Sequence, residues 1–182
     1  MTNDPSYQKL FSDGVKLHEL GIAGDKNAVK KACDIFAKLH KADPQDHLAE
    51  AYFGSSTALL GRDSIDPNQK LKLTLRGIKM LDKVIAKDPQ NIETRSIRAY
   101  VNFNLPEMVF HRTGSAVEDF NTLITMYEHD KKAISEDFYH QVLYDLGVAY
   151  KRVGKIEQMK TVWAKLSQMT KDPIILKKIA QE

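Results

Sequence analysis

The chain has 182 residues, of which 42% are hydrophobic and 28% are charged. This balance is typical of a soluble globular domain and excludes a chain that is disordered throughout. Lysine and arginine number 27 against 24 acidic residues, so the net charge of +3 excludes the strongly basic character of a dedicated nucleic-acid binder. The length predicts one domain or one short array of repeats.

The N-terminal segment, the apolar runs and the single cysteine indicate the setting of the protein. Residues 1–7 contain no basic segment leading into an apolar one, so we expect no signal peptide and a cytoplasmic location. Apolar runs such as residues 108–110 are far shorter than the roughly 20 residues of a membrane span, so we expect no membrane association. Cys33 lies on the apolar side of its predicted helix and is expected in the core, with a reactive thiol as the alternative.

Proline residues mark the expected helix boundaries. Five of the six prolines follow an aspartate, at residues 4–5, 43–44, 66–67, 88–89 and 172–173. Aspartate can cap a helix and proline suits its first turn, while the residue before a proline disfavours helical angles. Between these dipeptides apolar residues recur every three or four positions, without the alternation typical of strands. The sequence therefore predicts an all-α protein.

Four helix pairs are expected in chain order, followed by a short capping helix. Their approximate bounds are residues 4–44, 45–89, 90–130 and 134–172, with the capping helix over residues 173–181. In the second helix of each pair, a small residue or methionine precedes a bulky one by four positions: Ala32 with Phe36, Gly77 with Leu81, Ala116 with Phe120, and Met159 with Trp163. The first helices carry their own small residues: Gly14, Gly54, Ala99 and Gly147. Small residues let two helix backbones approach, so the pairs are expected to stack within one domain.

These residues resemble the tetratricopeptide repeat family, which places Leu-Gly and Tyr on the first helix and Ala-x3-Phe before a Pro on the second. The match is clearest in the last repeat, with Leu146, Gly147, Tyr150, Trp163 and Pro173 at the family spacing. The resemblance covers nearly the whole chain and implies a right-handed α-solenoid whose first helices line a concave groove.

The repeat length departs from that of the family. The offsets between repeats average roughly 42 residues, whereas the family period is 34. The excess falls in residues 21–27, 60–70 and 104–114. Either the turns have become loops or the helices are longer, and inserted loops often carry function.

A peptide-binding groove is the leading candidate for a site. The residue after each small residue points away from the partner helix, which defines a groove face with these members: Phe11, Val15, His18, Ala51, Ser55, Ala58, Ser96, Tyr100, Phe103, Tyr144, Val148, Lys151 and Arg152. Aromatic anchors and a basic rim would suit an amphipathic or extended peptide. The alternative is that several of these residues only pack against one another. The carboxylate clamp that some family members carry is not expected here, because Phe11, Val15 and Ser55 occupy that face.

The inserted segment at residues 104–114 and the uneven charge suggest further contacts. The segment is unusually apolar, and its candidate contact residues are Met108, Phe110, His111 and Arg112. It either folds back over a gap between helices or contacts a partner. Residues 62–87 carry a net charge of +4 and residues 107–137 a net charge of −4, which could steer a charged partner or a second copy of the chain.

No catalytic motif supports an enzyme. The sequence lacks the nucleophile-elbow, P-loop and dinucleotide-binding patterns, and no two histidines have His-x3-His spacing, so we expect no cofactor and no metal. The sequence predicts a non-enzymatic module that binds a protein or peptide, as a monomer or weak homodimer without specific nucleic-acid binding. A cytoplasmic chaperone for one client is the first alternative, and an RNA-binding helical repeat or an enzyme is the second.

Overall fold

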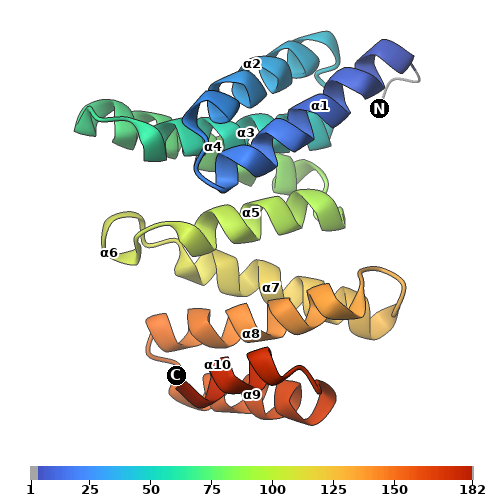
Figure 1. The fold of residues 1–182 in the computed structure, drawn as a ribbon, viewed down its shortest axis with the longest axis vertical. Coiled ribbons are helices and arrows are strands. Elements are labelled where there is room, and N and C mark those ends of the chain that lie inside the picture. Colours follow the sequence, from blue (N-terminus) through green and yellow to red (C-terminus); the bar gives the residue numbers. More distant parts are fainter. Residues whose placement is uncertain (1–3, 182) are drawn as a thin grey trace. The chain divides into compact units, whose positions relative to one another are not determined.

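The computed structural model describes residues 4–181, and every regular element in that range is an α-helix (Figure 1). The ten helices of the described range are α1 (Pro5–Ile22), α2 (Lys26–Ala42), α3 (His47–Asp63), α4 (Pro67–Lys87), α5 (Ile92–Asn104), α6 (Glu107–Phe110), α7 (Thr113–His129), α8 (Glu136–Arg152), α9 (Ile156–Met169) and α10 (Pro173–Gln181). The all-α prediction is confirmed. Within the same range, no helix is both long enough and apolar enough to cross a bilayer.

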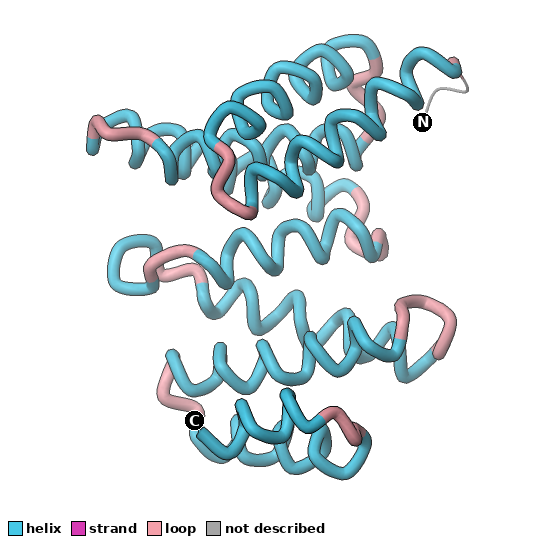
Figure 2. Tube along the Cα trace, viewed as in Figure 1, coloured by secondary structure: helices cyan, strands magenta, loops and turns pink. Residues whose placement is uncertain are grey.

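The chain divides into two compact units, residues 1–101 and 102–182, with the boundary inside α5. In the first unit α1 packs on α2, α2 on α3 and α3 on α4, and α1 also contacts α3. In the second unit α7 packs on α8 and α8 packs on α9. Short connections join these helices (Figure 2). Most helix contacts within a unit are therefore made between neighbours along the chain.

The Asp-Pro dipeptides lie at helix boundaries, as predicted. Asp4, Asp66 and Asp172 precede α1, α4 and α10, and each carboxylate accepts a hydrogen bond from the backbone amide two residues later, at 2.8–2.9 Å. Asp43 and Asp88 instead follow the last residues of α2 and α4. The dipeptide thus starts three helices and ends two, because an Asp before a Pro can cap a following helix or stop a preceding one.

Glycines of the first helices contact bulky residues of the second helices. A β-carbon built at Gly14 of α1 would lie 2.9 Å from Cζ of Phe36 in α2. A β-carbon at Gly147 of α8 would lie 1.9 Å from Nε1 of Trp163 in α9. Both bulky side chains are buried. In these two pairs, the small residue provides the space that the partner's aromatic ring occupies.

Helices α3 and α4 approach each other almost backbone to backbone. A β-carbon at Gly77 would lie 2.5 Å from the carbonyl oxygen of Gly54, and one at Gly54 would lie 3.1 Å from the carbonyl oxygen of Gly77. Nearer the helix ends, a β-carbon at Gly61 would lie 2.4 Å from Oγ1 of Thr74. These close approaches between α3 and α4 explain why α3 carries small residues along one side.

The segments in which the sequence placed extra residues, 21–27, 60–70 and 104–114, are mostly helical rather than loops. Only residues 23–25 connect α1 to α2, and only residues 64–66 connect α3 to α4. Helix α4 is 21 residues long. Residues 104–114 include the short helix α6. Of the two expectations for the extra residues, longer helices rather than loops describe segments 21–27 and 60–70.

Cys33 lies in the core of the first unit, as predicted. Its Sγ is 3.8 Å from Oγ1 of Thr57 in α3, and the side chain is buried. Burial raises the pKa of the Cys33 thiol, although the Thr57 contact and the charge of Arg76 oppose this effect. The thiol is therefore protonated at neutral pH and shielded from solvent.

This position predicts slow modification of Cys33. We expect a thiol-reactive aromatic disulfide at about pH 7.5 to react at least about 100-fold more slowly with the native protein than with the urea-unfolded chain. The measurement is the rate of release of the coloured thiolate. Similar rates in the two states would mean that the contact between α2 and α3 opens readily.

Candidate functional site

Two of the predicted groove residues meet inside the first unit. Nε2 of His18 in α1 is 2.8 Å from Oγ of Ser55 in α3, and both side chains are buried. The His18 ring also packs edge-on against Tyr52, with 5.1 Å between ring centroids. Burial lowers the pKa of His18 to about 4, so the ring is neutral at pH 7. The pair joins α1 to α3 and offers no exposed surface to a ligand.

Phe11 and Val15 lie beside this pair on α1. Phe11 packs edge-on against Phe36 and Tyr52, with centroid distances of 5.6 and 5.7 Å. Both Phe11 and Val15 are half-buried and pack against the core of α1, α2 and α3. Of the smaller residues predicted on the same face, Ala51 and Ala58 are buried. His18 and Ser55 contact each other, but Phe11 and Val15 pack into the core of α1, α2 and α3, and Ala51 packs with Leu81 and Val84 of α4. The α1 and α3 members of the predicted face are thus mostly used for packing within the first unit.

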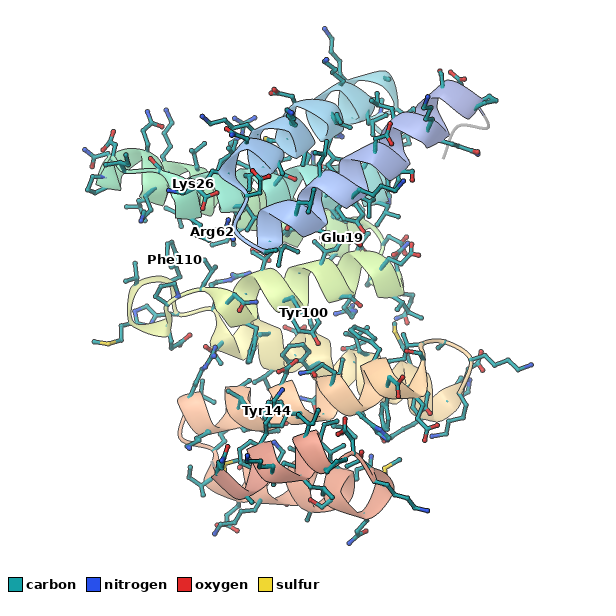
Figure 3. All side chains as sticks on the ribbon, in the orientation of Figure 1. Glu19, Lys26, Arg62, Tyr100, Phe110 and Tyr144 are labelled. Carbon is teal, nitrogen blue, oxygen red and sulfur yellow. The ribbon has the colours of Figure 1, made fainter. Side chains whose placement is uncertain are left out.

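Arg62 fastens the end of α3 to the end of α1. Its guanidinium donates hydrogen bonds to the carbonyl oxygens of Gly21 at 2.8 Å and Ile22 at 3.4 Å, and it pairs with Asp63 (Figure 3). The last carbonyls of a helix lack partners within it, so a cation at this position is favourable. This contact holds the C-terminal end of α1 in place.

Ser96 and Tyr100, two of the predicted residues of α5, are only partly exposed. Ser96 is half-buried, and its hydroxyl donates a 2.8 Å hydrogen bond to the carbonyl oxygen of Ile92 one turn earlier. Tyr100 is half-buried (Figure 3). Ala99, the small residue next to it, is fully buried.

Phe103 and Arg152 contact each other within the second unit. The Arg152 guanidinium lies 4.3 Å from the centroid of the Phe103 ring and donates a hydrogen bond to the Phe103 carbonyl oxygen. Phe103 is buried and packs edge-on against Phe120 of α7, with a centroid distance of 5.5 Å. One face of the predicted aromatic anchor is therefore covered by the predicted basic rim residue, as expected for a cation–π pair.

Tyr144, Val148 and Lys151 form one strip along α8, which we call the α8 strip. Their spacing of four and then three residues places them on the same helix face. Tyr144 and Val148 are half-buried, and Lys151 is exposed. The strip changes along its length from an aromatic side chain to a cation.

The ring of Tyr144, labelled in Figure 3, stacks on the ring of Trp163 in α9. The two rings are nearly parallel, with 6.0 Å between centroids, and Nε1 of Trp163 donates a 3.1 Å hydrogen bond to the Tyr144 carbonyl oxygen. Lys178 of α10 lies 5.5 Å from the centroid of the Tyr144 ring. The Tyr144 ring thus contacts α9 through Trp163, with Lys178 of α10 close to it.

The short helix α6 exposes apolar side chains. Met108 and Val109 are 91% and 60% exposed, while Phe110 is half-buried. His111 follows with a φ of 51°, in the left-handed region, and is exposed. Of the four candidate contact residues in this segment, Met108 and His111 are the most accessible.

Both ends of α6 are anchored. A carboxylate oxygen of Glu107 accepts a 2.7 Å hydrogen bond from the backbone amide of Thr113, at the start of α7. Nε of Arg112 donates a 3.1 Å hydrogen bond to Oδ1 of Asn102. Arg112, a candidate contact residue, is therefore engaged within the second unit.

A cavity that the sequence did not indicate lies between the start of α8, the end of α9, and α10. Its volume is about 480 Å³, and its lining includes Glu136, His140, Asp172 and Lys178. Nε2 of His140 is buried and has no hydrogen-bond partner, with Glu136 at 3.9 Å. Among residues 4–181, no group of three His, Cys, Asp or Glu side chains is placed to hold a metal ion.

No protein-family model matches the chain, and no curated protein is significantly similar to it. Function is therefore inferred from the chemistry and positions of the side chains.

Proposed function

We propose that the protein is a non-enzymatic module that binds a peptide segment or a protein surface, centred on the α8 strip. We further propose that its helices form a right-handed tetratricopeptide-like solenoid of four pairs, α1/α2, α3/α4, α5/α7 and α8/α9, with α10 as the cap. Glycine in the first helix facing an aromatic residue in the second supports this architecture in α1/α2 and α8/α9. A cytoplasmic setting is part of the proposal, and an unpaired cysteine is compatible with it.

The α8 strip is the observation that carries the proposal. Tyr144 presents an amphipathic ring that already stacks on Trp163. Binding of a peptide to this ring therefore costs little additional side-chain entropy. Val148 and then Lys151 follow Tyr144 on the same helix face, so the strip ends in a cation. A peptide with an apolar side chain followed by a carboxylate would match this order of groups.

In this proposal the residues of the first unit stabilise the fold and do not contact the bound peptide or protein. His18 and Ser55 are buried against each other, and Phe11 packs into the core. The binding surface is accordingly narrower than the face expected from the sequence. Within the second unit it consists of the three residues of the α8 strip.

Site-specific photocrosslinking tests the proposal. We expect a photoreactive amino acid at Val148 to capture a protein from the cell of origin at least about fivefold more efficiently than one at Ala164, an exposed position on α9. Adding Tyr144→Ala is expected to lower the yield about tenfold, whereas Tyr144→Phe keeps the ring and the adduct. Circular dichroism checks that each variant is folded.

Two outcomes would contradict the proposal. Equal capture at Val148 and Ala164 would indicate random collision with abundant proteins. An adduct at Val148 that survives Tyr144→Ala unchanged would indicate that the tyrosine ring is not part of the binding surface.

A further inference from the structure

The positive charge of the protein is concentrated on two helices of the first unit. Helix α2 carries five lysines against one aspartate, a net charge of +4. Helix α4 carries five lysines and one arginine against one aspartate, a net charge of +5. The whole chain has a net charge of +3, so the remaining residues sum to −6. All eleven cationic side chains of α2 and α4 are exposed.

Helices α2 and α4 border the same side of α3. The Phe53 ring of α3 lies 5.6 Å from the guanidinium of Arg76 in α4 and 6.2 Å from the imidazole centroid of His40 in α2. Both helices pack on α3. The charge of Arg76 also reaches the Cys33 thiol of α2. Arg76 of α4 therefore lies close to α2, and we call the exposed cationic side chains of these two neighbouring helices the α2/α4 face.

On α4 the cations form a regular row. Lys72, Arg76, Lys79 and Lys83 follow one another at intervals of four, three and four residues, opposite the buried side of the helix. At 1.5 Å per residue the row is about 16 Å long. Cations repeated about every turn match carboxylates repeated at the same interval on an extended or helical segment.

The row is not neutralised within the protein. Lys83 pairs with Glu50 of α3 at 3.2 Å, but no carboxylate of residues 4–181 lies within ion-pairing distance of Lys72 or Lys79. Repulsion among neighbouring cations disfavours this arrangement unless an anion binds to it. The row therefore favours an anionic partner.

Apolar side chains next to the row distinguish between anionic partners. Leu71 and Leu75, one turn apart on α4, are 46% and 50% exposed. A phosphodiester backbone makes no use of such side chains, whereas an acidic protein segment can place an apolar residue over them. The low net charge of the whole chain also gives little long-range attraction for nucleic acid.

We infer that the α2/α4 face binds an acidic segment of a partner protein. Carboxylates of the segment align with Lys72, Arg76 and Lys79, and an apolar side chain covers Leu71 and Leu75. This surface lies on α2 and α4, so it is distinct from the α8 strip and goes beyond the function proposed there.

Fluorescence anisotropy with a labelled peptide of repeated Glu-Glu-Leu units, about 16 residues long, tests the inference at physiological salt. We expect Lys72→Glu/Lys79→Glu to weaken binding at least about tenfold. The control Lys155→Glu/Lys177→Glu changes the net charge by the same amount at exposed residues of the second unit and is expected to change binding less than about twofold.

A second variant separates the apolar contribution from charge. Leu75→Ser is expected to weaken binding of the Glu-Glu-Leu peptide about threefold and to leave binding of polyglutamate unchanged. The inference is overturned if the wild-type protein does not bind the peptide, or if the control variant weakens binding as much as Lys72→Glu/Lys79→Glu. Single-stranded RNA or phosphatidylserine vesicles that bind more tightly than the peptide, without sensitivity to Leu75→Ser, would also overturn it.

Discussion

Replacing Gly147 with alanine should destabilise the second unit by about 3 kcal/mol. The new methyl group would lie 1.9 Å from Nε1 of Trp163 and 2.4 Å from its Cε2, inside the van der Waals radius of both atoms. Moving the indole away from the methyl group costs free energy, because the indole is buried, stacks on Tyr144 and donates a hydrogen bond to the Tyr144 carbonyl oxygen. Relief of the overlap therefore breaks this stacking or separates α8 from α9.

Gly114→Ala is the matched control for this substitution. Gly114 lies in the first turn of α7 and has nothing within 4 Å of an added β-carbon. Alanine there should be neutral or stabilising by about 0.5–1 kcal/mol, because it restricts the unfolded chain. Urea unfolding measures both variants, and emission of Trp163, the one tryptophan of the chain, reports on the ring directly. The close packing of α8 on α9 would be refuted if Gly147→Ala matched Gly114→Ala in both measurements.

Helix class and helix boundaries could be predicted from the sequence because their causes are local. The Asp-Pro dipeptides act within one turn, through a cap and through the restriction that proline places on its predecessor. Gly147 and Trp163 could each be recognised from the sequence as packing residues, but their contact with each other depends on how α8 and α9 are placed, which the sequence pattern does not give. The formation of α6 was missed, since a helix of four residues leaves no periodic pattern.

The exposure of the candidate site could not be predicted in the same way. The predicted groove face of α1 assumed that the helix packs on α2 only, but α1 also contacts α3, so His18 becomes buried. The contact between Arg152 and Phe103 joins residues 49 positions apart, which helix periodicity cannot detect. The net charge of residues 62–87 revealed part of the positive charge of α4. The positive charge of α2 was missed, because assigning each lysine to a helix requires the helix bounds.

Below pH 6.5 the first unit should lose stability because of His18. In the folded protein, burial lowers the pKa of His18 to about 4, whereas the ordinary value is 6.5. Between these values the unfolded chain binds a proton that the folded protein does not, so the free energy of unfolding falls as the pH falls. The contribution is complete above pH 6.5 and is lost by about pH 4. At about 1.4 kcal/mol per pH unit, the total loss is about 3 kcal/mol.

His18→Gln should remove this part of the pH dependence, because glutamine does not titrate while its amide can still hydrogen-bond to Ser55. Urea unfolding at a series of pH values from about 7.5 to about 4.5 compares the slopes of the variant and the wild-type protein. His129→Gln, at an exposed position in α7, is the matched control and should keep the wild-type slope. Parallel profiles for His18→Gln and the wild type would show that His18 is open to solvent. In that case α1 and α3 would not enclose the imidazole, and His18 would become available to a ligand.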